Sequence, residues 1–171
     1  MALDDKSTAS ARRLPTGARL AAVVSEYHQD LTGGMLRSAQ AELEAAGLEE
    51  NALEVAWVPG AFELPIVAQR FASRTDIDAV LCFGLVLTGE TTHDRWVCQA
   101  ATDGILKVSL ETQTPVLFGL LTCQTLEQAR QRALPPSEGG HHDKGREVAR
   151  AALGVLEALA VAAGRSEGER P

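Results

Sequence analysis

A glycine-containing segment that leads to a histidine carries the clearest chemical signal in this chain. It reads Gly84-Leu-Val-Leu-Thr-Gly89-Glu-Thr-Thr-His93. The spacing of the glycines, with Thr91 behind them, comes close to a Walker A loop, but Glu90 stands in the lysine position. A carboxylate there would repel a polyphosphate, so the segment does not predict a nucleoside triphosphatase. A glycine-containing turn that leads into a helix N-terminus instead suits a single phosphate group.

His93 is expected in the first turn of that helix, behind a variant capping box formed by Thr91 and Asp94. The helix dipole disfavours the charged imidazolium at this end, so a neutral ring is available to accept a proton. A lone histidine is more often structural. Its place beside an anion-binding turn at the end of a strand favours a role in proton transfer.

The elements that position this segment alternate between short apolar runs and amphipathic stretches. Continuous apolar runs predict strands covered on both faces, and a 3.6-residue period predicts helices. Strands so spaced imply right-handed crossovers and a parallel sheet. The predicted fold class is α/β, a three-layer α/β/α sandwich with a four-stranded parallel sheet, flavodoxin-like. The expected strands are 19–24, 53–58, 79–83 and 115–119, and the expected helices are about 30–46, 61–73, 92–112, 126–134 and 144–163.

Bulk properties indicate one soluble domain over residues 18–163, with a flexible N-terminal arm at 1–17 and a flexible tail at 164–171. The formal net charge of −7 argues against nucleic acid or an anionic membrane as a partner. The sequence has no long apolar run and no signal-peptide pattern. Its three cysteines fit no disulfide framework and are expected to be buried thiols, which suits a cytoplasmic location.

Parallel sheets bind ligands at the carboxyl ends of their strands, so the residues that follow each expected strand are site candidates. Tyr27 is either a core residue or a surface on which a flat heterocycle stacks. Glu63 either suits the helix dipole or accepts hydrogen bonds from a polyol. Phe118 is an aromatic at the end of the fourth strand. The sequence His141-His142-Asp143 reads as a surface loop, and no metal site is predicted.

Several segments together resemble the lumazine synthase family. They are Val-Pro-Gly-Ala-Phe-Glu-Leu-Pro from Val58, Gly-Glu-Thr-Thr-His from Gly89, Phe-Gly-Leu-Leu-Thr from Phe118, and Glu-Gln-Ala-x-x-Arg-Ala followed by Asp-Lys-Gly. The resemblance runs from about Leu20 to Ala160, with the motifs in the order and spacing of the family. It implies the same four-stranded parallel sandwich, assembled at least as a pentamer whose active sites are shared between neighbouring subunits.

The resemblance also implies a role for each site residue. His93 would be catalytic, and Tyr27 would stack on a pyrimidine. Glu63 would accept hydrogen bonds from a ribityl chain, and Phe118 would come from the adjacent subunit. The remaining residues implied are Ala61 and Phe62 for the ribityl chain, Leu85, Val86 and Leu87 for the pyrimidine edge, Glu90, Thr91 and Arg132 for a phosphate, and Lys144 as a basic residue that lines the site.

The implied reaction joins 5-amino-6-(D-ribitylamino)uracil to 3,4-dihydroxy-2-butanone 4-phosphate and gives 6,7-dimethyl-8-ribityllumazine. The pyrimidine amine forms an imine with the ketone, phosphate is eliminated, and the ribitylamino nitrogen closes the second ring with loss of water. The implied partners are these two small molecules and further copies of the chain. No metal or redox cofactor is implied.

The chain departs from the family pattern at several positions. Thr88 stands where many members carry a basic residue, and Tyr27-His28 replaces the commoner Phe-Asn. The segment from Leu134 to Lys144 is longer than in members that form icosahedral shells, and it lies near the contacts between pentamers. We therefore expect this protein to stop at a pentamer.

Three alternatives remain open from the sequence. One is a pentameric protein that binds the heterocycle without turnover. A second is the pentameric type of riboflavin synthase, which dismutates two lumazines. The third, a flavodoxin-like carrier or phospho-receiver domain, is disfavoured: the carrier's phosphate loop is missing after the first strand, and Gly84 stands where a receiver needs aspartate.

Overall fold

The computed structural model describes residues 12–164, and its centre is a sheet of four parallel strands in the order β2-β1-β3-β4. The strands are β1 (Leu20–Ser25), β2 (Leu53–Val58), β3 (Ala79–Leu87) and β4 (Val116–Cys123). Every pairing is parallel, as the alternation of apolar runs and helices predicted. The predicted fold class is confirmed.

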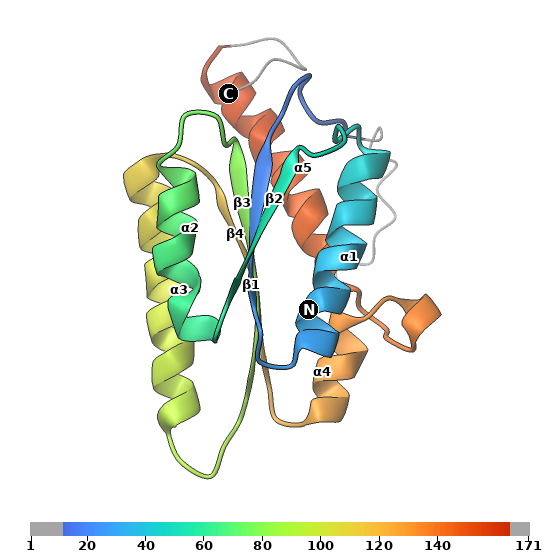
Figure 1. The fold of residues 1–171 in the computed structure, drawn as a ribbon, viewed down its shortest axis with the longest axis vertical. Coiled ribbons are helices and arrows are strands. Elements are labelled where there is room, and N and C mark those ends of the chain that lie inside the picture. Colours follow the sequence, from blue (N-terminus) through green and yellow to red (C-terminus); the bar gives the residue numbers. More distant parts are fainter. Residues whose placement is uncertain (1–11, 165–171) are drawn as a thin grey trace.

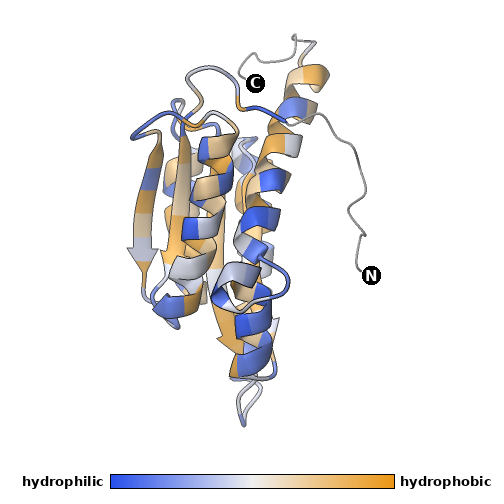
Figure 2. Ribbon diagram, turned by 90° about the vertical axis from the view of Figure 1, so that its right-hand side faces the viewer, coloured by the Kyte–Doolittle hydropathy of each residue, from blue (hydrophilic) through white to orange (hydrophobic). Residues whose placement is uncertain are grey.

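Helices cover both faces of the sheet (Figure 1). One face is covered by α2 (Leu64–Ala72) and α3 (His93–Thr112), and the other by α1 (Gln29–Ala45), α4 (Leu126–Ala133) and α5 (Lys144–Ala162). Figure 2 shows apolar residues along the strands and polar residues on the outward sides of the helices. Within residues 12–164, no helix combines the length and the apolar character needed to cross a membrane.

The central strand β1 is buried along its whole length. Its side chains alternate between the two halves of the core, with Leu20 and Val24 facing the α1 side and Val23 facing the α2 side. A strand with neighbours on both edges and helices on both faces has no contact with water, which explains its uninterrupted apolar sequence.

Two strands run further than predicted. The third strand was expected to end at Phe83 with Gly84 as a turn, but β3 continues to Leu87 and Gly84 pairs with Leu120. A Cβ on Gly84 would stand 2.8 Å from Leu120 Cδ1, so the glycine permits close packing and forms no turn. The fourth strand continues to Cys123, which places Phe118 within β4 and not at its end.

No side chain caps the start of α1. The N-cap is His28, whose backbone is left-handed (φ 57°) and whose side chain makes no capping bond. The Thr32 hydroxyl instead donates to the Ser25 carbonyl oxygen at 2.8 Å, which ties the helix to the end of β1.

Of the expected N-terminal arm, residues 1–11 lie outside the described residues, as do residues 165–171 of the expected tail. Leu14 is buried in the core on the α1 side, and its N–H donates to the Ala46 carbonyl oxygen at 3.0 Å. Arg12 forms an ion pair with Glu157 of α5 at 2.8 Å. Contacts with the domain therefore begin before residue 18.

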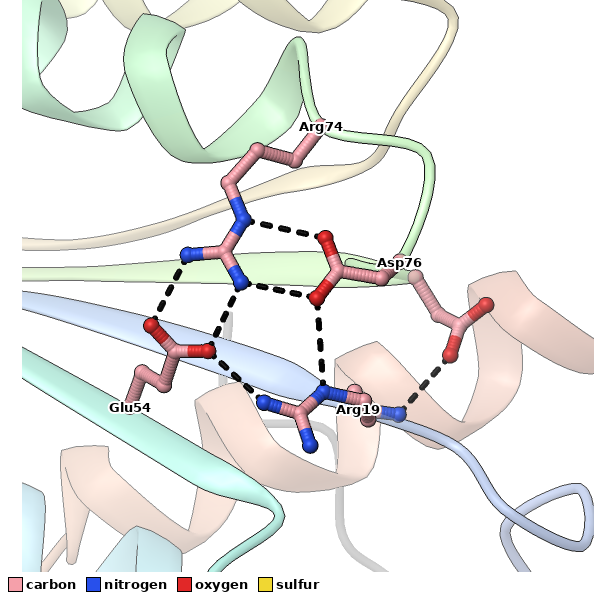
Figure 3. A network of polar contacts seen from close by, with 5 residues as sticks. Arg19, Glu54, Arg74 and Asp76 are labelled. Carbon is pink, nitrogen blue, oxygen red and sulfur yellow. Dashed lines mark hydrogen bonds and ion pairs between the residues drawn. The ribbon is translucent and has the colours of Figure 1, made fainter.

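A network of ion pairs links residues at the amino ends of the strands (Figure 3). The Arg74 guanidinium donates two hydrogen bonds to the Glu54 carboxylate and two to the Asp76 carboxylate, with nitrogen–oxygen distances of 2.7–3.0 Å. Arg19 adds a 2.8 Å bond to Glu54. The Arg74 hydrogen bonds are the largest cause that holds the pKa of both the Glu54 and Asp76 carboxyls below their ordinary range.

This network predicts a pH dependence of stability. Because the folded carboxyl pKa values are lowered, the stabilisation is present above the ordinary values of 4.5 and 3.8 and is lost as the pH falls through the lowered ones. Arg74→Met should lower the Tm most near neutral pH, with the difference from wild type narrowing below about pH 4. Arg70→Met on α2 is the control. A difference that stays constant with pH would contradict this role.

A close approach of α5 to α1 depends on a glycine. A Cβ on Gly145 would overlap the backbone carbonyl of Met35, which cannot move away as a flexible side chain would. Gly154, further along the same helix, would place its Cβ no closer than 3.3 Å to the Arg12 side chain.

We predict opposite effects of the same substitution at these two glycines. Gly145→Ala should reduce the free energy of unfolding by about 1–3 kcal/mol through steric overlap. Gly154→Ala should increase it by up to about 1 kcal/mol, because alanine is the better helix former. Urea unfolding of both variants measures this. A Gly145→Ala protein as stable as wild type would show that the helices can separate without cost.

Candidate active site

An open cleft of about 750 Å³ lies at the carboxyl ends of β1, β2 and β3. This volume is within the usual range for small-molecule sites. Its walls come from the β1–α1 loop, the turn after β2, the end of β3 and the first turns of α3. The lining residues are Tyr27, His28, Gly60, Ala61, Phe62, Glu63, Leu85, Val86, Leu87, Gly89, Thr91, His93, Asp94, Trp96 and Val97.

Tyr27 forms an aromatic wall of the cleft. It lies two residues after the end of β1 and is 70% exposed, so it is not a core residue. The exposure contradicts the core alternative for Tyr27, and the stacking role stays a prediction. The ring of His28 stands against it at 63°, with 6.2 Å between the ring centroids.

The turn after β2 presents Glu63 to the cleft. A short 3₁₀ helix (Ala61–Glu63) follows Gly60, and Glu63 Oε2 accepts a hydrogen bond from the Gly60 N–H at 3.0 Å. The carboxylate therefore stabilises the turn by a hydrogen bond, a role that neither sequence alternative for Glu63 included. A carboxylate offers about four acceptor positions, so this bond leaves capacity for the hydroxyl groups of a ligand. Pro65 lies in the first turn of α2, where its missing N–H costs no helical hydrogen bond.

The end of β3 leads into the turn that precedes His93. Leu85 is buried, while Val86 and Leu87 are partly exposed as the strand leaves the core. His93 is the first residue of α3, and its N–H donates to the Thr91 hydroxyl oxygen at 3.4 Å. The expected capping box is absent, because the N-cap is Thr92, whose side chain makes no capping bond. His93 itself is exposed and lines the cleft.

Four residues expected at the site do not line this cleft. Glu90 is exposed in the turn beside it. Phe118 lies in the middle of the edge strand β4, opposite Cys82, and is 42% exposed. Arg132 belongs to α4 and Lys144 to α5, both on the other face of the sheet (Figure 1). The Lys144 ammonium pairs with Glu147 at 2.8 Å.

The cleft also includes residues that were not predicted from the sequence as site residues. Trp96 and Val97 lie three and four residues after His93, so they share its helix face, and this spacing could have identified them. Trp96 is 67% exposed at the cleft. His28 and Asp94 had been noted, one only as a departure from the family pattern and the other only as a capping residue.

The cysteines lie outside the cleft lining. Cys82 and Cys123 are buried as predicted, whereas Cys98 is only partly buried. Burial raises the pKa of the Cys82 thiol to about 12. Among residues 12–164, no three histidine, cysteine, aspartate or glutamate side chains are grouped closely enough to hold a metal ion.

The fold and the cleft define a class: a flavodoxin-like α/β sandwich with an open cleft at the strand ends and a histidine at a helix start. Comparison with known proteins narrows the class. Residues 17–160 match the 6,7-dimethyl-8-ribityllumazine synthase family, and the chain belongs to that family. It is 39% identical over 140 residues to a 6,7-dimethyl-8-ribityllumazine synthase of Protochlamydia amoebophila (strain UWE25), an alignment that spans 82% of this chain and 79% of the relative.

The bond between Glu63 and Gly60 generates a stability prediction. Glu63→Ala should reduce the free energy of unfolding by about 1 kcal/mol, because the part-buried Gly60 N–H loses its acceptor. Glu63→Gln keeps an oxygen at that place and should cost less. Thermal unfolding of the two variants compares them, and equal losses would show that the bond does not stabilise the turn.

Proposed function

We propose that this chain is the enzyme that condenses 5-amino-6-(D-ribitylamino)uracil with 3,4-dihydroxy-2-butanone 4-phosphate, giving 6,7-dimethyl-8-ribityllumazine, phosphate and water. Family membership supports this reaction over heterocycle binding without turnover and over lumazine dismutation. The observation that carries the proposal is the cleft itself, which brings Tyr27, Glu63 and His93 together from three separate segments of the chain.

In this proposal the pyrimidine stacks on Tyr27, and the backbone groups of Leu85, Val86 and Leu87 contact its polar edge. Its ribityl chain lies along Ala61, Phe62 and Glu63, where the Glu63 carboxylate accepts from the hydroxyls. The phosphate of the second substrate lies at the turn of Glu90 and Thr91, near the N-terminus of α3, where backbone N–H groups favour an anion. His93 then stands between the two substrates.

His93 transfers the protons that each step requires. The amine loses two protons as the imine forms, and the ketone oxygen leaves as water. The carbon beside the imine carbon then loses a proton as phosphate leaves, and the methylene group that results takes up a proton to become a methyl group. A second water leaves on ring closure. General acid–base catalysis by a positioned side chain contributes about 10²–10⁴-fold. The larger contribution comes from holding two substrates in reacting geometry, which can supply about 7–11 kcal/mol of the barrier. No cofactor is needed for this balance of atoms and electrons.

The charge of the cleft supports a site shared between subunits. The ionisable side chains that line it are Tyr27, His28, Glu63, His93 and Asp94, and none of these described residues is a lysine or arginine. Binding of a phosphorylated substrate requires positive charge near the phosphate. In a chain with a net negative charge, a few basic side chains close to the site must provide it. We therefore propose that Phe118, Arg132 and Lys144 complete the cleft of a neighbouring copy in a homopentamer located in the cytoplasm. Arg132 would pair with the phosphate.

Substitution of His93 tests its role. His93→Gln should reduce kcat by about 10²-fold or less, while the KM for each substrate changes little, because the substrates are held by other groups. His142→Gln, in the loop before α5, is the matched control and should equal wild type. An unchanged kcat in His93→Gln would remove this residue from the mechanism.

Mixed oligomers test the shared site. His93→Gln and Phe118→Ala should each be impaired when expressed alone. Co-expressed, they should form some sites with intact residues from both chains and so regain part of the lost activity. Absence of any recovery in proven mixed oligomers would place Phe118 outside the neighbour's site.

The mass of the native assembly tests the pentamer. The long segment from Leu134 to Lys144 packs against α1: a Cβ on Gly34 would overlap the Leu134 side chain, and Arg37 pairs with Glu138 at 3.1 Å. We expect light scattering to give about five times the chain mass of 18.2 kDa. A mass near sixty chains would contradict the proposed state.

A further inference from the structure

His28 lines the cleft beside Tyr27, yet the proposed reaction assigns it no role. Its backbone is left-handed, with φ 57° and ψ 49°. Residues with a side chain seldom adopt this conformation, although asparagine, aspartate and histidine do so more often than others. Backbone strain of this kind is frequent at functional sites.

The backbone of His28, and not its ring, starts helix α1. Its carbonyl oxygen accepts from the N–H of Leu31 at 2.8 Å, the N–H of Thr32 at 3.0 Å and the Thr32 hydroxyl at 3.4 Å. The imidazole makes no capping bond. A residue that tolerates the left-handed region can therefore replace histidine without loss of the helix start.

The ring of His28 instead contacts Tyr27. The two rings meet edge to face, with centroids 6.2 Å apart and planes at 63°. This lies within the favoured range for aromatic pairs. Tyr27 is 70% exposed, so the packed core does not fix its orientation, and an adjacent ring restrains it.

We propose that His28 is a positioning residue for the heterocyclic substrate: its imidazole holds the Tyr27 ring in the orientation on which the pyrimidine stacks. This inference rests on the proposed function, in which Tyr27 is the stacking surface. A side chain ordered before binding loses less conformational freedom when the ligand arrives. Loss of the ring contact should weaken binding of the pyrimidine by about 2- to 10-fold.

His28→Asn tests the proposal, because asparagine tolerates the left-handed backbone but carries no ring. The KM for the ribitylaminouracil should rise about 2- to 10-fold, while kcat and the KM for the sugar phosphate stay near wild type. Gln113→Asn is the matched control. Gln113 is also left-handed (φ 57°) and ends α3, a helix of 20 residues that separates it from His93 by about 30 Å.

The interaction itself can be tested with a double variant. If His28 acts through Tyr27, adding His28→Asn to Tyr27→Leu should raise the KM no further than Tyr27→Leu alone. Additive effects would show that His28 acts independently of Tyr27 and would overturn the positioning role.

A spectroscopic readout is independent of turnover. The chain has one tyrosine, so 3-fluorotyrosine labels Tyr27 alone and gives one ¹⁹F signal. His28→Asn should shift this signal, and Gln113→Asn should leave it in place. An unshifted signal together with a wild-type KM would overturn the inference. If wild type forms no lumazine, the proposed function fails, while the ¹⁹F signal still decides whether His28 sets the Tyr27 ring.

Discussion

The parallel direction of all four strands is the constraint on which the site depends. Because every strand points the same way, the segments that follow β1, β2 and β3 all begin at the same end of the sheet, where the strands have their carboxyl ends. β1 lies between β2 and β3, so the loop after β1 lies between the segments that follow β2 and β3. Tyr27, Glu63 and His93 are far apart in the sequence and meet because of this arrangement alone. Apolar contacts on both faces of the sheet, and the ion pairs of Arg19 and Arg74 at the amino ends of the strands, hold the sheet in place.

The same constraint explains which features were predictable. Uninterrupted apolar runs such as that of β1 predict strands buried on both faces, and their alternation with helices fixes a parallel sheet. A parallel sheet binds ligands at the carboxyl ends of its strands. This rule predicts that Tyr27, Glu63 and His93, which follow three of the strands, lie at the cleft. The roles of these residues came from the motifs that resemble the family, since each residue alone had a structural explanation.

Other features were beyond the sequence because they depend on tertiary contacts. Gly84 suggested a turn, yet it lies inside β3, where the absence of a Cβ lets the Leu120 and Leu64 side chains pack close to the strand. That error shortened β3 and the strand paired with it, and so misplaced Phe118. The left-handed backbone of His28, whose carbonyl oxygen accepts hydrogen bonds from α1, is a feature that no local pattern predicts. The position of Arg132 and Lys144 on the other face of the sheet from α3 likewise could not be predicted without knowing which helices cover each face.

The function proposed for this cleft is to join two substrates and release phosphate. The most direct measurement is to mix purified protein with the ribitylaminouracil and the butanone phosphate, and to follow lumazine absorbance and free phosphate together. Both products should form in equal amounts and only when both substrates are present. Lumazine absent with both substrates present, or phosphate released from the sugar phosphate alone, would contradict it.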